Sequence, residues 1–202
     1  MKKDVVVLVG SLRELSYARK IAKNAIDMFS DEFYAEIVEI RDLPLYDADY
    51  DDINNTNKPL PESYVQFRKK IKDAAGVLFV TSENNRTIPA CLKNAVDVAS
   101  KPKGDVAWTN TPVAVISHSV GAMGGYSANK NLRLALSYFT MPTVQQPEVF
   151  LGHSPELLDE SGKFNNEATF NFVKKYIEQF EKLIKDNPKA VSYTHLRAHE
   201  TS

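Results

Sequence analysis

The sequence predicts an α/β fold in which five parallel strands form one sheet, in the order 2-1-3-4-5, with helices on both faces. Two observations predict this doubly wound, three-layer sandwich. Short apolar runs typical of buried strands alternate with longer segments whose apolar residues recur at helical spacing. Most of the predicted strands also end in a polar or glycine-rich turn. The 202 residues suffice for a single domain, which we expect to span residues 1–190.

The first predicted strand, residues 5–9, is apolar throughout and mostly β-branched, as in a strand buried on both faces. Apolar residues then recur at helical spacing and predict a helix over about 14–29. Alternating polarity predicts a second strand over 34–40. Residues 41–60 are acidic and rich in asparagine, with few helix or strand signals. A loop of this length in a compact domain is usually functional or an interface, although a solvated surface loop remains the alternative.

The remaining elements follow the same alternation. We predict helices over about 62–75, 88–100, 128–139 and 164–185, and strands over 77–81, 112–117 and 144–150. Gly76 is expected to end the second helix, and Phe170 and Phe172 to join the apolar face of the last one. Trp108 follows the third helix, and we interpret it as an anchor in the core or an interface.

The turn after the first strand has the composition of a phosphate-binding loop. Gly10 permits a tight turn, and Ser11 and Ser16 supply hydroxyls beside the unpaired N–H groups of a helix start. Arg13 adds a full positive charge to the partial charge of the helix dipole. The spacing matches neither of the two common glycine-rich phosphate loops. An ordinary capped connection between strand and helix is the alternative.

Two further polar turns fall at the same predicted sheet edge. Residues 82–89 follow the third strand, and residues 117–125 follow the fourth. In open parallel sheets, ligands bind outside the carboxyl ends of the strands, where the winding direction switches. His118 lies in the last of these turns as we predict it, and a lone histidine there is more often incidental than an acid or base.

The first of these turns, Gly10-Ser11-Leu12-Arg13-x-x-Ser16, resembles the phosphate loop of the NADPH-dependent FMN reductase family, which includes quinone, chromate and azo-dye reductases. The second resembles that family's flavin-facing segment at Thr81, Glu83, Asn85, Ile88, Pro89, Leu92, Lys93, Asn94, Ala95 and Asp97. The third resembles its glycine-rich turn. The resemblance spans about residues 4–186 and implies a flavodoxin-like fold. The chain departs from the family pattern at Ala18, Ser82, Asn84, Arg86 and Thr87.

The resemblance implies that the protein binds FMN, takes hydride from NADPH or NADH, and reduces a quinone, chromate, an azo compound or free flavin by a ping-pong mechanism. Because flavin carries the redox chemistry, no catalytic side chain and no metal is expected. The implied FMN-binding residues are Ser11, Leu12, Arg13, Ser16, Tyr17, Ala18, Ser82, Glu83, Asn84, Asn85, Ser117, Ser119 and Gly121. The resemblance also implies a homodimer or homotetramer, with Tyr46 and Asp47 reaching toward a neighbouring subunit's flavin. A flavodoxin-type electron carrier and a flavin-free binding domain are the alternatives.

Composition excludes several other classes. A net charge of −1 without a basic cluster argues against nucleic acid as a partner. No apolar run approaches the roughly 20 residues of a membrane helix, so we expect a cytoplasmic protein that binds no membrane. Cys91, the single cysteine, allows no internal disulfide and is expected to be a buried structural thiol. Residues 191–202 resemble translated vector sequence and are excluded from the fold prediction, including the His195 and His199 pair.

Overall fold

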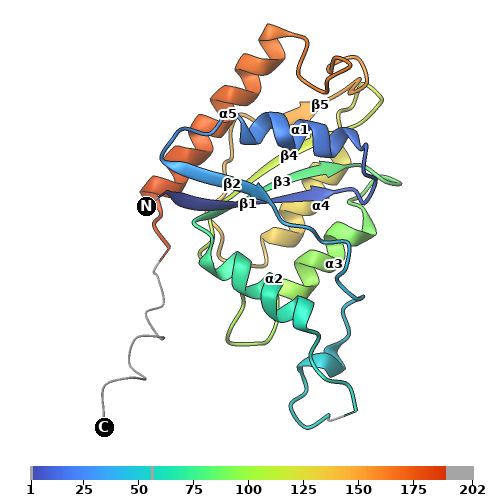
Figure 1. Cartoon of the computed structure of the whole chain (residues 1–202), viewed down its shortest axis with the longest axis vertical. Helices are drawn as coiled ribbons and strands as arrows, with labels where there is room; N and C mark the ends of the chain where they lie inside the picture. Colours follow the sequence, from blue (N-terminus) through green and yellow to red (C-terminus); the bar gives the residue numbers. More distant parts are fainter. Residues whose placement is uncertain (1, 56, 190–202) are drawn as a thin grey trace.

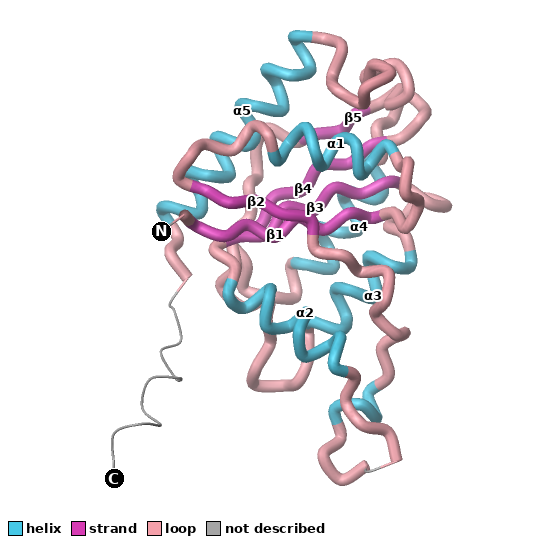
Figure 2. The backbone as a smooth tube through the Cα atoms, in the orientation of Figure 1, coloured by secondary structure: helices cyan, strands magenta, loops and turns pink. Residues whose placement is uncertain are grey.

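The computed structural model describes residues 2–55 and 57–189, and these residues form the predicted doubly wound sandwich. Five parallel strands lie in the order β2-β1-β3-β4-β5, which confirms the predicted order. The strands are β1 (Lys3–Gly10), β2 (Phe33–Ile37), β3 (Gly76–Ser82), β4 (Val113–His118) and β5 (Val149–Leu151). Figure 2 shows these strands as one central layer between helices.

The helices cover the sheet on both faces (Figure 1). They are α1 (Tyr17–Ile26), α2 (Glu62–Asp73), α3 (Ala90–Ala99), α4 (Tyr126–Leu136) and α5 (Glu167–Asp186), with a short 3-10 helix, η1, at Ala48–Asp51. Alternate strand residues separate the core into two clusters. Val7, Val80 and Ile116 pack against α1 and α5, whereas Leu8 and Phe79 pack against α2, α3 and α4.

The structure differs from the prediction at the start of β5 and on the buried face of α5. β5 begins only at Val149, because Pro147 has no N–H to donate to a ladder. The stretch before it touches the sheet through one isolated bridge, between Val113 and Thr143. In α5, Phe170 and Phe172 are 43% and 38% exposed, so the prediction that they belong to the buried face is wrong.

Gly76 does not end α2, which stops at Asp73, but begins β3. A Cβ at this position would approach the Cδ1 of Ile184 to 2.7 Å and the Cζ of Phe180 to 3.0 Å. The glycine is therefore required by the close approach of α5 to the sheet, and not by the helix end that the sequence pattern indicated.

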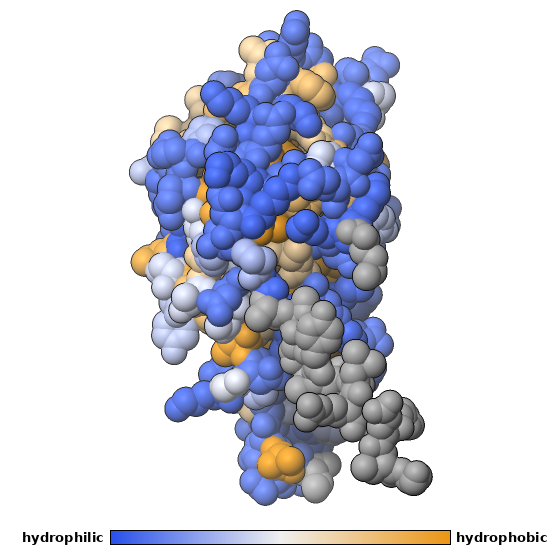
Figure 3. All heavy atoms as spheres, turned by 90° about the vertical axis from the view of Figure 1, so that its left-hand side faces the viewer, coloured by the Kyte–Doolittle hydropathy of each residue, from blue (hydrophilic) through white to orange (hydrophobic). Residues whose placement is uncertain are grey.

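The 41–60 segment is anchored to the helices although it has little regular structure. The guanidinium of Arg68 forms two hydrogen bonds with the carboxylate of Asp51, at 2.7 and 2.8 Å, and its Nε donates to the carbonyl of Val98. Both charged side chains are nearly buried. The segment forms the lower end of the molecule in Figure 1, and an apolar spot stands at that end in Figure 3. Its described residues include Ile53, which is 94% exposed.

Trp108 is fully buried and donates its indole N–H to the carbonyl of Val96, which confirms its interpretation as a core anchor. Cys91 is half-buried rather than fully buried, and burial raises the pKa of its thiol.

Within residues 2–55 and 57–189, no helix is long and apolar enough to cross a membrane. The same residues contain no group of three potential metal ligands. The predicted foreign tail at 191–202 lies outside the described residues.

Candidate functional site

The loops that follow β1, β3 and β4 meet at the carboxyl edge of the sheet, the right-hand end of the strands in Figure 1. Gly10 pairs with Thr81 in register, and Ser82 pairs with His118. The Ser82 hydroxyl donates to the Gly10 carbonyl at 2.8 Å, which joins the first two loops directly. A Cβ at Gly10 would approach the Oγ1 of Thr81 to 2.7 Å, so only glycine allows this contact without a shift.

The β1–α1 loop presents a set of unpaired donors. Ser16 caps α1 by accepting a hydrogen bond from the Arg19 N–H at 3.1 Å. The N–H groups of Tyr17 and Ala18, in the first turn of α1, make no hydrogen bond within the described chain. Such N–H groups, together with the helix dipole, favour a bound anion. The Ser16 hydroxyl adjoins them at the N-cap, and the Ser11 hydroxyl accepts a hydrogen bond from the Arg13 N–H at 3.4 Å.

The charges beside this loop are divided between two tasks. The Arg19 guanidinium forms two hydrogen bonds with Glu39, each at 2.7 Å, and these raise the pKa of Arg19 and lower that of Glu39. Arg41 donates to the carbonyl of Leu12 and so fixes the middle of the loop. Arg13 is exposed and has no ion pair with any described residue. Arg13 is therefore the cation available for an anion bound at α1.

The loop after β3 is a tight hairpin. Asn84 and Thr87 exchange two backbone hydrogen bonds, at 2.9 and 3.0 Å, and the residues between them, Asn85 and Arg86, have φ angles of 49° and 68°. Two positive φ angles define a type I′ turn. The side chains of Asn84 and Asn85 are exposed. Their amides can both donate and accept hydrogen bonds, as recognition of a heterocyclic edge requires.

Two side-chain contacts hold this turn against α4. Glu83 accepts a hydrogen bond from the Ala128 N–H at 3.1 Å. It thereby caps a helix whose own N-cap residue, Gly125, has no side chain to do so. The Asn131 amide donates to the Arg86 carbonyl at 3.0 Å. The Glu83 side chain therefore joins the second loop to the first turn of α4, the helix that follows the third loop.

The β4–α4 loop offers backbone groups more than side chains. The Ser117 hydroxyl is fully buried, donates to the Gly124 carbonyl at 2.9 Å and accepts from the Asn129 amide at 3.3 Å. Ser119 donates its hydroxyl to the Gly121 carbonyl at 2.9 Å. A Cβ at Gly121 would meet nothing within 4 Å, so space does not require glycine there. Ser117 therefore shapes the loop from inside, and the outer surface of the loop is formed by Ser119 and the residues after it.

His118 is not an incidental turn residue, because it ends β4 and is only 5% exposed. Its Nδ1 lies 3.0 Å from the Ser154 hydroxyl, whose own proton is donated to the Ser119 carbonyl at 3.0 Å. Nδ1 must therefore be the donor, and Nε2 has no partner within the described residues. Burial lowers the pKa of His118 to about 4, so the ring is neutral at pH 7 and holds the third loop in place. The continuous apolar run before His118 was the sequence signal that could have placed this residue at the end of a buried strand.

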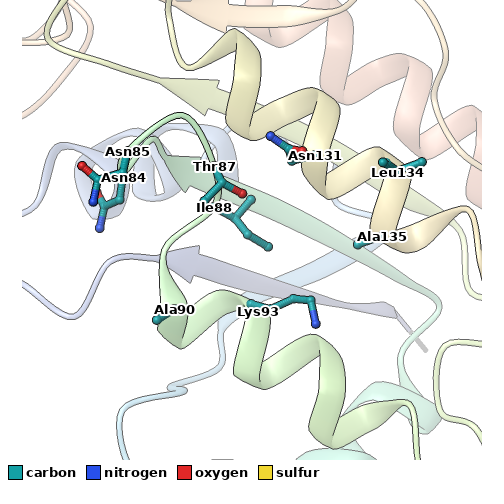
Figure 4. A pocket seen from close by; sticks show the side chains of 9 residues that line it. All are labelled: Asn84, Asn85, Thr87, Ile88, Ala90, Lys93, Asn131, Leu134 and Ala135. Atoms are coloured by element: carbon teal, nitrogen blue, oxygen red, sulfur yellow. The ribbon is translucent and has the colours of Figure 1, made fainter.

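A groove of about 620 Å³ lies between α3 and α4 and reaches the hairpin after β3 (Figure 4). It is lined by Asn84, Asn85, Thr87, Ile88, Ala90, Lys93, Asn131, Leu134 and Ala135. In Figure 4, Asn131 faces the hairpin from α4, and Lys93 lies on α3. This groove could not be predicted from the sequence, because its two walls come from α3 and α4, which lie far apart in the chain and meet only in the fold.

Comparisons with known proteins agree with this fold. A sequence model described as NADPH-dependent FMN reductase matches residues 3–156. A quinone reductase from Pseudomonas putida is 43% identical over 91% of this chain and 96% of its own length. A 2-hydroxy-1,4-benzoquinone reductase from a Burkholderia species is 34% identical over 92% of this chain and 98% of its own. The solved structure of FerB, a flavoenzyme NAD(P)H:(acceptor) oxidoreductase from Paracoccus denitrificans, superposes with a TM-score of 0.82 at 30% identity, covering 92% of this chain and 98% of that one.

Proposed function

Because this chain belongs to the NADPH-dependent FMN reductase family, we propose that it is an FMN-dependent enzyme that oxidises NADPH or NADH and reduces a quinone. One observation carries the proposal. The unpaired N–H groups of Tyr17 and Ala18, the hydroxyls of Ser11 and Ser16 and the free Arg13 guanidinium form a phosphate-type donor set. This donor set is joined directly to the amide-rich hairpin after β3.

In this proposal, the β1–α1 loop holds the FMN phosphate. Arg13 supplies the charge, Ser11 and Ser16 donate hydroxyl protons, and the N–H groups of Leu12, Tyr17 and Ala18 complete the set. Ala18 contributes through its backbone, which makes the side-chain donor usual in the family at that position dispensable.

The other two loops hold the flavin ring. Ser82 to Asn85 supply amide and backbone groups to one edge, and Ser119, Gly121 and the backbone after Ser117 border the other end. When bound, FMN supplies the redox chemistry by accepting a hydride and passing its electrons to the acceptor. The protein positions the reactants, and none of its side chains is required as an acid, base or nucleophile.

A quinone is the proposed acceptor because the Pseudomonas and Burkholderia relatives bear the names of quinone reductases. Chromate, azo compounds and free flavin are further acceptors within this proposal. The donor and acceptor are expected to occupy the same exposed flavin face in turn, which gives ping-pong kinetics. Initial rates at several fixed quinone concentrations should then produce parallel double-reciprocal lines.

An anaerobic experiment tests the proposal directly. The purified protein, loaded with FMN, is mixed with NADPH while its flavin absorbance is followed, and 1,4-benzoquinone is then added. Rapid bleaching followed by recovery of the absorbance supports the proposal. Absorbance that persists with NADPH identifies an electron carrier instead, and protein that takes up no FMN identifies a flavin-free binding domain.

We also propose that the protein forms a homodimer or homotetramer. Large apolar side chains are exposed on the 41–60 segment, on α4 and in the turn after it, with Leu45 79%, Ile53 94%, Leu134 71% and Tyr138 87% accessible. Tyr46 and Asp47, on the anchored 41–60 segment, are the residues expected to approach a neighbouring subunit's flavin. Light scattering coupled to size exclusion measures the mass, and a monomer at micromolar concentration would contradict this proposal.

A further inference from the structure

Arg86 occupies a backbone conformation that few arginines adopt. It is the second central residue of the type I′ hairpin, with a φ angle of 68°, where glycine is the usual residue. Neighbouring groups maintain this conformation. Asn84 and Thr87, on the two sides of the turn, exchange backbone hydrogen bonds, and the Asn131 amide donates to the Arg86 carbonyl. Strained residues held in this way concentrate at functional sites.

The Arg86 side chain is exposed, and within the described residues it forms no hydrogen bond or ion pair. Its charged neighbours are already engaged. The Glu83 carboxylate caps α4, and Lys93 is paired with Asp97 at 2.7 and 2.8 Å. The tip of this hairpin therefore presents a cation that no nearby group neutralises, beside the amides of Asn84 and Asn85.

We propose that Arg86 binds a phosphate group of the nicotinamide dinucleotide and so helps to determine which hydride donor the enzyme prefers. This inference rests on the proposed function. Because Ser82 to Asn85 are proposed to border the flavin, Arg86 at the tip of the same hairpin lies beside the place to which a nicotinamide dinucleotide that reached the flavin would bring its phosphates. A guanidinium offers two parallel N–H groups that match phosphate oxygens. The backbone strain at position 86 is retained because it projects this charge from the tip.

Equilibrium titration of the FMN-loaded protein with NADP⁺ and with NAD⁺ tests this assignment, because neither oxidised dinucleotide reduces the flavin. Arg86→Gly removes the cation and suits the positive φ, so it should fold at least as well as the parent chain. Arg86→Lys retains the charge. Lys175→Gln, an exposed position on α5 at the opposite face of the sheet, controls for the change in net charge.

We expect Arg86→Gly to weaken NADP⁺ binding about tenfold or more, the factor of one charge-assisted hydrogen bond. Arg86→Lys should retain much of the NADP⁺ affinity that Arg86→Gly loses, and Lys175→Gln should change the NADP⁺ affinity less than twofold. An equal loss for NAD⁺ assigns the contact to the pyrophosphate, and a loss confined to NADP⁺ assigns it to the 2′-phosphate. NADP⁺ and NAD⁺ affinities within twofold of the parent, or a parallel loss of FMN affinity, would overturn the proposal.

The titration and the anaerobic test fail independently. If NADPH does not bleach the flavin, the proposed function is wrong whatever the affinities are. If NADPH bleaches the flavin of Arg86→Gly at saturation but the dinucleotide affinities are unchanged, only the role of Arg86 is wrong. In turnover, Arg86→Gly should raise KM for NADPH and leave KM for the quinone unchanged.

Discussion

The Ser16 hydroxyl is expected to serve both helix stability and phosphate binding, and two substitutions at this position separate the two roles. Its oxygen accepts the Arg19 N–H, and its proton, which no described residue accepts, is available to a phosphate oxygen. Ser16→Ala should lower the free energy of unfolding of the apoprotein by about 1 kcal/mol, the value of a serine N-cap. For a chain of this size, that corresponds to a fall in Tm of about 2–4 °C. It should also weaken FMN binding about tenfold or more, through the loss of a hydrogen bond to a charged oxygen.

Ser16→Asp should have a different pair of effects. Aspartate caps helices about as well as serine, so the apoprotein should stay within a few tenths of a kcal/mol of the parent. A carboxylate about 4 Å from a phosphate oxygen is repelled by about 4 kcal/mol at an effective dielectric constant of 20. FMN affinity should therefore fall by more than a hundredfold while the helix remains intact.

Urea unfolding of the apoproteins, followed by the fluorescence of the buried Trp108, measures stability, and quenching of FMN fluorescence measures binding. Asn166→Asp is the matched control, because Asn166 caps α5 through the Thr169 N–H at 3.0 Å. It adds the same charge at another N-cap and should leave FMN affinity unchanged. If Ser16→Asp binds FMN as tightly as the parent protein, the phosphate does not lie at the amino end of α1.

The other predictions concern pH, the anchored loop and the cap of α4. The folded protein keeps His118 neutral down to about pH 4, whereas the unfolded chain binds the proton near 6.5. The free energy of unfolding should therefore fall by up to about 3 kcal/mol as the pH is lowered from 6.5 to 4. Urea unfolding of His118→Gln should lack this part of the loss. Arg68→Leu leaves Asp51 buried without its partner and should lower the free energy of unfolding by about 3–5 kcal/mol. Adding Asp51→Leu to the same chain should restore part of this loss. Equal stability of the single and double variants would exclude a buried pair. Glu83→Ala should lower thermal stability by the equivalent of about 1 kcal/mol, and Glu83→Gln, which can still accept from the Ala128 N–H, should lower it less.

Several features of the fold follow from local sequence alone. The β-branched run at 5–9 predicts a strand buried on both faces, and every residue in it is at most 3% exposed. The apolar spacing in α1, α2 and α3 predicted helices close to those observed. The alternation of these elements with short connections permits few topologies, and the order β2-β1-β3-β4-β5 is among them.

Other features could not be predicted, because they depend on contacts between distant parts of the chain. The motif includes Glu83 among the residues of the cofactor loop, but it does not indicate that the Glu83 side chain caps a helix that begins more than forty residues later. The motif also includes Ser117, and the enclosure of the Ser117 hydroxyl by Gly124 and Asn129 likewise depends on the fold. Gly76 was interpreted as a helix end, although the side chains of α5 are what require it.

By itself, the sequence determined the periodicity of each element and the residue types available at three turns, because these depend on neighbours within a few positions. Only the tertiary structure decided which of those polar groups remain free for a ligand. The N–H groups of Tyr17 and Ala18 stay unpaired, whereas the hydroxyl of Ser117 and the carboxylate of Glu83 are engaged within the protein. The physical reason is that a polar group near a site is available only when folding has brought no other partner to it.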